Sequence, residues 1–267
     1  MLMISEVFHN NGLVVTQLPA FPQLNAFLED IDFEAIGRLQ DEEEFRCAVL
    51  DAQERFNSSY LHHKICWGLE HTLASITNTD DLMISGVAFM RVVRPRGTCG
   101  KFEYLDFHRE SFYATGEFVN HQINIHVPLR GYGNLSAMQY IPLSHLINDE
   151  EFLLDQIPET ETGFVRGSSK HLGGLMYRPK KIVSGVDLDS AVPLPVRFGE
   201  AAIFSSKLIH GGGVNHTQNI RVSVDFAIIP SDCVQNEHNF QLAATFDSKH
   251  KGDKYVPLRT KVDSSHV

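Results

Sequence analysis

Residues 119–129 read VNHQINIHVPL, and polar residues occupy every second position of this stretch. Asn120, Gln122, Asn124 and His126 alternate with Val119, His121, Ile123, Ile125 and Val127. A period of two is typical of a β-strand, because successive side chains point to opposite faces of a sheet. Further short apolar stretches lie at 82–93, 201–205 and 220–229. Strands at irregular spacing, without alternating helices, predict an antiparallel sandwich or barrel.

The first third of the chain has helical periodicity instead. Three apolar stripes recur every three or four residues: Leu24, Phe27, Leu28 and Ile31; Phe45, Val49, Ala52 and Phe56; and Leu61, Ile65, Leu69 and Leu73, the last within a stretch from about Tyr60 to Ile76. The acidic residues 41–44 suit the first turn of a helix, where the macrodipole favours negative charge. These stripes predict a helical layer packed on one sheet, and the alternative is a separate helical binding module.

We expect one domain over residues 1–267. Residues 1–80 are the mainly helical support, and residues 81–230 are the β core with a long polar loop at 142–199. Residues 231–267 are a C-terminal extension. Loops as long as 142–199 inside a compact domain are usually functional, so this loop is a candidate lid or binding segment.

Composition excludes some partners. Lys and Arg number 23 against 33 for Asp and Glu, which gives a formal net charge of −10. Binding to a phosphate backbone or an anionic membrane relies on clustered positive charge, so neither partner is expected. The four cysteines form no CxxC pair, which argues against a thiolate zinc site. Without a signal peptide or a run of 18 apolar residues, the expectation is a cytoplasmic protein.

A possible metal centre is divided between two distant parts of the sequence. His108 and Glu110 stand two residues apart, and on extended backbone such residues point to the same side and can converge on one ion. About a hundred residues later, His210 opens a glycine-rich bend at 211–213 after an apolar stretch. Two histidines and one carboxylate form the facial triad that holds non-haem Fe(II) with open coordination positions.

Arg221 and Ser223 share one face of the predicted strand 220–229. An arginine presents a planar fork to a carboxylate, which makes it a natural anchor for the far end of a dicarboxylate cosubstrate. With the triad, these residues suggest Fe(II) and 2-oxoglutarate. Asn124 is a further candidate for binding the cosubstrate, and the alternative is a sheet amide bonded to a neighbour. For His126, on the same face, a structural role is favoured over support of the site.

The motifs, taken in order over about residues 83–230, resemble the phytanoyl-CoA-dioxygenase-like family of Fe(II)/2-oxoglutarate-dependent oxygenases. They are the HxE at 108–110, a strand ending in Pro-Leu at 128–129, MQYIPLSH at 138–145 (similar to the family's PGSH turn), and His210 followed by Arg221 and Ser223. The resemblance implies a double-stranded β-helix, a jelly roll of the cupin-like kind. The fold class is thus mainly β, with N-terminal helices packed on one sheet.

The resemblance also implies the chemistry. His108, Glu110 and His210 would bind Fe(II), and 2-oxoglutarate would chelate the metal and place its C5 carboxylate on Arg221 and Ser223. With O2 as co-reactant, the expected reaction is hydroxylation of an unactivated C–H in a small molecule, releasing succinate and CO2. The substrate class is an amino acid or an intermediate of specialised metabolism. Two alternatives stay open: desaturation, epoxidation or ring formation with the same cofactors, and a non-catalytic cupin-like protein that binds a metal or ligand.

The chain departs from the family pattern at two positions. Leu143 stands where the PGSH turn has glycine, so the turn before the long loop is expected to differ in shape. Glu110 stands where aspartate is commoner. Halogenases of this superfamily have glycine or alanine there, so a carboxylate at this position argues against halogenation. Near the triad, Arg109 and Asp106 are further candidates for contact with substrate. Arg166, Lys170 and His171 cluster in the long loop, where a solvated run is favoured over contact with an anionic substrate.

Overall fold

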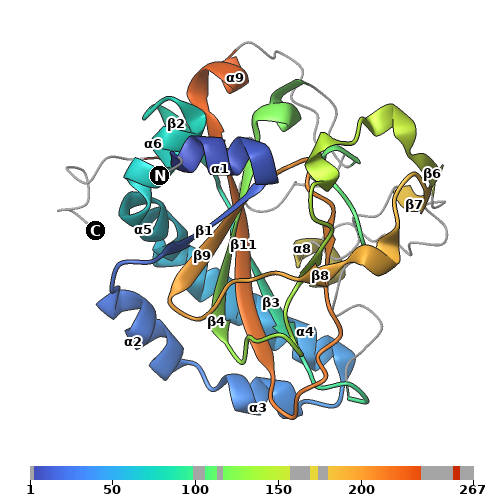
Figure 1. The fold of residues 1–267 in the computed structure, drawn as a ribbon. Coiled ribbons are helices and arrows are strands. Elements are labelled where there is room, and N and C mark those ends of the chain that lie inside the picture. Colours follow the sequence, from blue (N-terminus) through green and yellow to red (C-terminus); the bar gives the residue numbers. More distant parts are fainter. Residues whose placement is uncertain are drawn as a thin grey trace.

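The computed structural model describes residues 3–98, 106–112, 117–156, 169–173, 180–235 and 255–258. Its largest sheet has seven strands in the order β1-β9-β4-β11-β2-β12, with β3 also paired to β11 (Figure 1). The strands are β1 (Leu13–Gln17), β2 (Leu82–Ser85), β3 (Phe89–Val93), β4 (Ile123–Arg130), β9 (Glu200–Ser205), β11 (Arg221–Pro230) and β12 (Tyr255–Pro257). Every pairing is antiparallel, which confirms the predicted sheet type.

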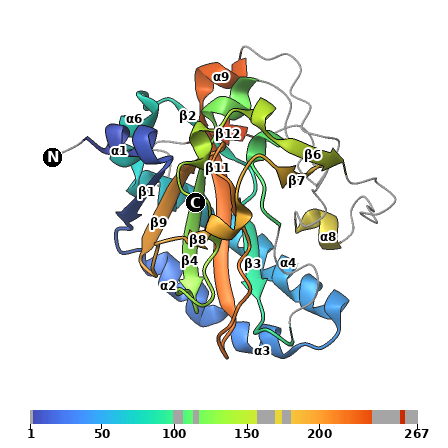
Figure 2. The ribbon, with the colours of Figure 1, turned by 45° about the vertical axis from the view of Figure 1, so that its right-hand side comes forward.

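A smaller sheet has the order β10-β5-β8, and a separate hairpin pairs β6 with β7. Their bounds are β5 (Gln139–Tyr140), β6 (Leu153–Gln156), β7 (Lys180–Ser184), β8 (Val192–Pro193) and β10 (His210–Gly211). An isolated bridge joins His108 to His210 and so ties the segment 106–112 to this sheet. Figure 2 shows the β6–β7 hairpin on the opposite side of the molecule from the N-terminal helix.

Six helices precede β2: α1 (Ile4–Asn11), α2 (Pro22–Asp30), α3 (Phe33–Arg38), α4 (Glu42–Ser58), α5 (Leu61–Gly68) and α6 (Glu70–Thr77). Later come α8 (Ser169–Leu172), α9 (Ser231–Gln235) and the 3-10 turns η1 (Glu110–Phe112), η2 (Glu117–His121), η3 (Ser144–Leu146), η4 (Asp149–Glu151) and η5 (Leu188–Ser190). Buried side chains of the early helices, such as Phe56 and Leu73, pack in one cluster with Ile125 and Val224 of the large sheet. The predicted helical layer on one sheet is therefore confirmed.

The apolar stripe of residues 61–73 is continuous, but the helix is not. Leu61, Ile65, Leu69 and Leu73 are all buried as predicted. The backbone breaks at Leu69, however, where φ is −104° and ψ is 3°. Gly68 stands at this break, and a Cβ there would lie 2.6 Å from Phe21 and 2.7 Å from Pro19. The chain before α2 thus packs against a helix end that tolerates no side chain.

Several strand and helix bounds differ from the predictions. The N-terminal support also contains a strand, because β1 pairs along β9 from Leu13 to Gln17. The stretch 82–93 forms two strands, and both pair with β11. Strand β2 pairs near the C-terminal end of β11, and β3 pairs near its N-terminal end. The first residues of 119–129 form the 3-10 turn η2, so the strand begins only at Ile123. The bounds of β1, β2, β3 and β4 are therefore set by the residues that pair with a neighbouring strand.

The polar positions of β4 face the interior between the two sheets. Ile125 and Val127 belong to the cluster formed with the helices, so Asn124 and His126 point to the opposite face. All residues of β4 are buried except Arg130. On the neighbouring strand β11, Arg221, Ser223 and Asp225 occupy the equivalent face, and Asp225 pairs directly with His126. The alternation at 119–129 therefore separates an apolar core from a polar interior, and not core from solvent.

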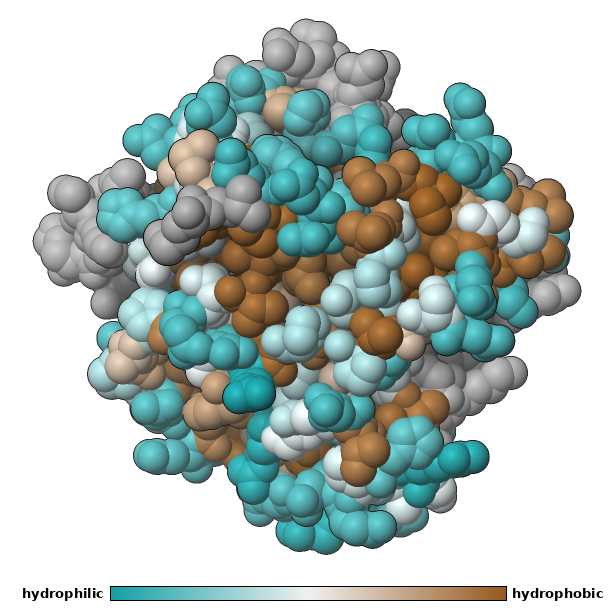
Figure 3. Space-filling model, in the orientation of Figure 1, coloured by the Kyte–Doolittle hydropathy of each residue, from teal (hydrophilic) through white to brown (hydrophobic). Residues whose placement is uncertain are grey.

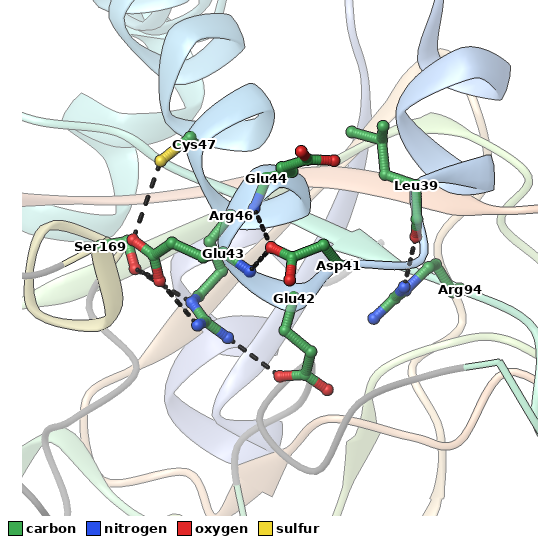
Figure 4. A network of polar contacts seen from close by, with 9 residues as sticks. All are labelled: Leu39, Asp41, Glu42, Glu43, Glu44, Arg46, Cys47, Arg94 and Ser169. Atoms are coloured by element: carbon green, nitrogen blue, oxygen red, sulfur yellow. Dashed lines mark hydrogen bonds and ion pairs between the residues drawn. The ribbon is translucent and has the colours of Figure 1, made fainter.

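At the N-terminus of α4 the predicted acidic turn is present. The Asp41 carboxylate caps the helix by accepting hydrogen bonds from the backbone N–H groups of Glu43 and Glu44, each at 2.9 Å (Figure 4). The Glu43 side chain accepts from Ser169 of α8 at 2.9 Å, which ties α8 to α4.

Apolar side chains reach the surface near the β6–β7 hairpin. Exposed side chains include Leu143, Leu146, Leu153 and Val183. Figure 3 shows apolar surface on this side of the molecule. Among the described residues, no helix has the length and apolar character needed to cross a membrane.

Candidate metal centre and cosubstrate site

The three residues of the predicted triad come together at one point. Ligand atoms of His108, Glu110 and His210 all lie within 4.8 Å of one another, and no other group of this kind occurs among the described residues. The Glu110 Oε1 atom is 3.7 Å from His108 Nε2 and 3.6 Å from His210 Nε2. Reciprocal backbone hydrogen bonds of 2.9 and 3.1 Å between His108 and His210 bring the two distant segments together.

Backbone carbonyl groups orient both imidazoles. His108 Nδ1 lies 2.6 Å from the Asp106 carbonyl oxygen, and His210 Nδ1 lies 2.9 Å from that of Leu208. A carbonyl only accepts, so each Nδ1 donates to its carbonyl oxygen, and each Nε2 lies on the side of Glu110. Glu110 itself begins η1 and is not on extended backbone, so its approach to His108 differs from the predicted route.

The electrostatics of the triad suit a divalent cation. Burial, together with the neighbouring His108, lowers the pKa of His210 to about 4, so its imidazole is neutral at pH 7. Burial raises the pKa of Glu110, but the adjacent imidazoles of His108 and His210 outweigh this and hold it below its usual value. Neutral imidazole and ionised carboxylate are the forms that bind metal. The donor set of two imidazoles and one carboxylate fits Fe(II).

Residues around the triad fix the chain that bears it. Ser144 Oγ accepts a hydrogen bond of 2.8 Å from the backbone N–H of Ile209, directly before His210. Arg109 is fully buried, donates to Asp149 at 2.5 Å and also hydrogen-bonds the carbonyl oxygen of Ser144. Arg109 was a candidate for contact with substrate, and the structure assigns it to these internal contacts instead. Asp106 contributes its carbonyl oxygen to His108.

The second group of candidates lies on the interior face of β4 and β11. Arg221 is 3% exposed; its Nη1 donates to the Ser136 carbonyl oxygen at 2.7 Å, and its Nε has no partner. The hydroxyl of Ser223 is also buried without a partner. Asn124 accepts from Gln122 Nε2 at 2.8 Å, while its own Nδ2 donates to nothing. Buried polar atoms without partners are costly, so these mark a place where a ligand would supply the missing partners.

Asp225 connects the two groups of residues. Its carboxylate interacts electrostatically with His210 of the triad and with Arg221. Burial raises the pKa of Asp225, but His126 and Arg91 lower it to about 2, so the carboxylate is ionised. No role is predicted from the sequence for Asp225, Arg91 or Tyr132. The signal was present for Asp225, because it continues the alternation of Arg221 and Ser223 on one face.

Leu143 adopts the conformation that glycine would have. Its φ is 60° and its ψ is 3°, in the left-handed region. Leu143 thus adopts a backbone conformation that usually favours glycine, and the expected difference from the family's turn stays a prediction. His145, at the end of the motif, contacts the His9 carbonyl oxygen at 3.2 Å. Arg166 and the side chains of Lys170 and His171 lie outside the described residues.

Comparisons with solved structures give the fold. The epimerase SnoN of nogalamycin biosynthesis, in complex with Fe3+, alpha ketoglutarate and nogalamycin RO, matches with a TM-score of 0.56 at 11% identity, over 96% of this chain and 97% of that one. EvdO2 from Micromonospora carbonacea var. aurantiaca, complexed with 2-oxoglutarate, matches with a TM-score of 0.56 at 14% identity, over 85% of this chain and 89% of that one. The carbocyclase SnoK of nogalamycin biosynthesis matches with a TM-score of 0.50 at 13% identity, over 85% of this chain and 83% of that one.

These matches confirm the predicted jelly-roll, cupin-like class. Among curated proteins, none matches the chain in sequence. The family model described as phytanoyl-CoA dioxygenase matches residues 51–223, which include the whole of the candidate site from His108 to Ser223. The chain belongs to the phytanoyl-CoA dioxygenase family and is a 2-oxoglutarate-dependent non-haem iron oxygenase.

Proposed function

We propose that the protein hydroxylates an unactivated C–H of a small molecule, with Fe(II) held by His108, Glu110 and His210. The proposal is supported by two features of one protein interior: the triad of metal ligands and the buried cation Arg221. One end has the three convergent ligand atoms, and the other has Arg221 with a buried Nε that lacks a partner. A dicarboxylate that chelates a metal at one end needs a cation at the other. 2-Oxoglutarate fits both ends.

Each residue has a distinct task in this reading. His108 and His210 would hold the metal through Nε2, because carbonyl groups engage their Nδ1 atoms and orient the rings. Glu110 would be the anionic protein ligand, and because it occupies a coordination position, that position is not open to a halide. Arg221 and Ser223 bind the distal carboxylate, and Asn124 offers its free Nδ2 to the cosubstrate. The bound iron and cosubstrate would supply the oxidising chemistry, whereas the chain provides orientation and a buried, dry site.

The substrate class is proposed to be an amino acid or an intermediate of specialised metabolism. Support comes from the structural neighbours, two of which act in nogalamycin biosynthesis. The activities of these two neighbours, epimerase and carbocyclase, also favour a second candidate: the same cofactors with ring formation, desaturation or epoxidation as outcome. A non-catalytic binding protein is disfavoured, because that reading expects a triad residue or Arg221 to face away from the interior.

Succinate release measured against pooled metabolites tests the proposal. Mass spectrometry of the consumed metabolite then separates the candidates, since hydroxylation adds one oxygen and desaturation or ring closure removes two hydrogens. Before turnover, anaerobic Fe(II) and 2-oxoglutarate together should produce a weak visible charge-transfer band. A folded, iron-loaded protein without that band would contradict the assignment of the cosubstrate site.

Two substitutions separate the two ends of the site. Glu110→Ala should abolish succinate production, because the metal loses the only anionic ligand that the protein supplies. Arg221→Ala should raise the 2-oxoglutarate concentration required, by about 10- to 100-fold for one charge-assisted hydrogen bond, with little effect on iron affinity. If Arg221→Ala weakened iron binding and left the cosubstrate requirement unchanged, Arg221 would not be the anchor.

A further inference from the structure

His126 has a free nitrogen in the interior of the site. Its Nδ1 lies 2.5 Å from Asp225 Oδ1, while its Nε2 is buried and has no hydrogen-bond partner. The side chain is only 2% exposed. A buried imidazole nitrogen without a partner is as costly as the unpaired atoms of Arg221 and Ser223.

Asp225 fixes the orientation of the His126 ring. The other oxygen of Asp225, Oδ2, lies 3.5 Å from Arg91 Nε. Arg91 in turn donates from Nη1 to the carbonyl oxygen of Gly173 at 2.5 Å, directly after α8. Asp225 is therefore fixed between a histidine and an arginine, and the His126 ring cannot turn without breaking a charged hydrogen bond. Such bracing is typical of groups that are preorganised to bind.

The strand register places His126 beside the proposed carboxylate anchor. Asp225 pairs with His126, and Ser223, two residues earlier in β11, pairs with Pro128. His126 and Ser223 are therefore near neighbours on the same interior face of the two strands. The Tyr132 ring lies 5.2 Å from that of His126, centroid to centroid. Tyr132 accepts a hydrogen bond of 3.0 Å from Met138 N–H and interacts electrostatically with Arg221. Tyr132 thus links His126 to Arg221, and both lie on the face that bears Ser223.

His62, a buried histidine in the apolar core, differs from His126 in its surroundings. His62 is also buried and has no hydrogen bond at either nitrogen. It packs between Phe56 and Phe226, with ring centroids at 6.4 and 6.0 Å, in the apolar layer between helices and sheet. Phe226 follows Asp225 in β11 and points to the opposite face. The two histidines therefore flank the same strand, one in an apolar environment and the other in the polar interior.

We propose that His126 Nε2 donates a hydrogen bond to the distal carboxylate of 2-oxoglutarate, together with Arg221 and Ser223, and that Asp225 is the positioning residue for this imidazole. Since the Asp225 carboxylate only accepts from Nδ1, donation from Nε2 requires the ring to take up a second proton as the ligand carboxylate binds, and Asp225 compensates the resulting charge. The inference rests on the proposed function. It makes the anchor a site with two cationic donors, selective for a dicarboxylate over a 2-oxo acid of equal length with an apolar end.

Two ligands and two variants test the contact. Calorimetric titration of the Ni(II)-loaded protein compares 2-oxoglutarate with 2-oxopentanoate, which has a methyl group in place of the distal carboxylate. In His126→Gln and His126→Phe, the Kd for 2-oxoglutarate should rise about 10- to 100-fold, the range for a charge-assisted hydrogen bond. The Kd for 2-oxopentanoate and for Ni(II) should change by no more than about twofold, because neither involves the lost contact.

His62→Phe is the matched control, since it replaces a buried histidine on the other face of β11 and should leave both ligand affinities unchanged. Asp225→Ala should reduce the preference for 2-oxoglutarate over 2-oxopentanoate, and Asp225→Asn should restore part of it, because an amide oxygen still accepts from Nδ1. A residue that only stabilises the fold would not change this preference. Circular dichroism verifies that each variant folds.

A measurement on the wild-type protein avoids substitution altogether. In Zn(II)-loaded protein with 15N-labelled histidine, 2-oxoglutarate should shift the Nε2 resonance of His126, and 2-oxopentanoate should not. Equal weakening of both ligands in the His126 variants, or unchanged 2-oxoglutarate affinity, would overturn the inference. Wild-type protein that binds metal but not 2-oxoglutarate would overturn the proposed function instead, so the two failures are distinguishable.

Discussion

The backbone of Leu143 is strained, because the turn before the long loop places it in the left-handed region. A left-handed φ of 60° costs a residue with a Cβ about 1 kcal/mol, and the side chain recovers little by burial because it is 52% exposed. We expect Leu143→Gly to raise the free energy of unfolding by up to about 1 kcal/mol, measured by chemical denaturation. Leu146→Gly, at an exposed position inside η3, is the control and should lower stability. A loss of stability in both variants would contradict the strain at Leu143.

His62 should make the protein sensitive to acid. Burial, with a smaller effect of His63, lowers the pKa of His62 to about 3, whereas the unfolded chain has the ordinary value near 6.5. The unfolded state therefore binds a proton that the folded state does not, and stability is lost as pH falls from about 6.5 toward 3, by up to about 1.4 kcal/mol per pH unit. His62→Phe should flatten this part of the stability curve, measured by urea denaturation at pH 7, 6 and 5.

The exposed His71 provides the comparison for that experiment, because its side chain is fully accessible to solvent in the folded protein. His71→Phe should leave the pH dependence as in the wild type. An equal acid sensitivity in wild type and His62→Phe would show that other groups dominate.

At the scale of single elements, α4 depends on its cap. Asp41 satisfies two backbone N–H groups that would otherwise lack partners, those of Glu43 and Glu44. We expect Asp41→Ala to lower the free energy of unfolding by about 1 kcal/mol, and Asp41→Asn to keep most of the stability, because asparagine caps equally well. Thermal unfolding of the three proteins would measure the difference. Identical loss in both variants would assign the effect to charge rather than to capping.

Helices were easier to predict than strands because their signals are local. The stripe of Phe45, Ala52 and Phe56 depends only on spacing within α4, and it is buried as predicted. The division of 82–93 into β2 and β3, in contrast, depends on which part of β11 each residue pairs with. The same holds for β1, whose five residues form a strand only alongside β9.

At the scale of the whole molecule, a metal ion would join segments that are far apart in sequence. Ligands at 108–110 and at 210 meet only in the folded state, so a bound metal stabilises the folded protein by mass action. We expect Ni(II) to raise Tm, with a further rise on adding 2-oxoglutarate, and EDTA to reverse both. At 100 times the Kd the gain is about 2.7 kcal/mol.

Glu110→Ala should remove most of the Ni(II)-dependent rise in Tm. Glu44→Ala, which removes an exposed carboxylate far from the triad in sequence, is the control and should retain it. A rise in Tm that persists in Glu110→Ala would point to metal bound elsewhere on the protein.

The sequence by itself determined the family, the antiparallel class, the helical layer and the candidates His108, Glu110, His210 and Arg221, because motif order and periodicity are properties of neighbouring residues. Only the tertiary structure decided the rest. It showed that the polar side of β4 faces an enclosed interior, that Asp225 lies opposite His126, and that Arg109 is a buried brace. Those facts follow from strand register and from packing between segments 35 to 99 residues apart, and neither leaves a signal within one short stretch of chain.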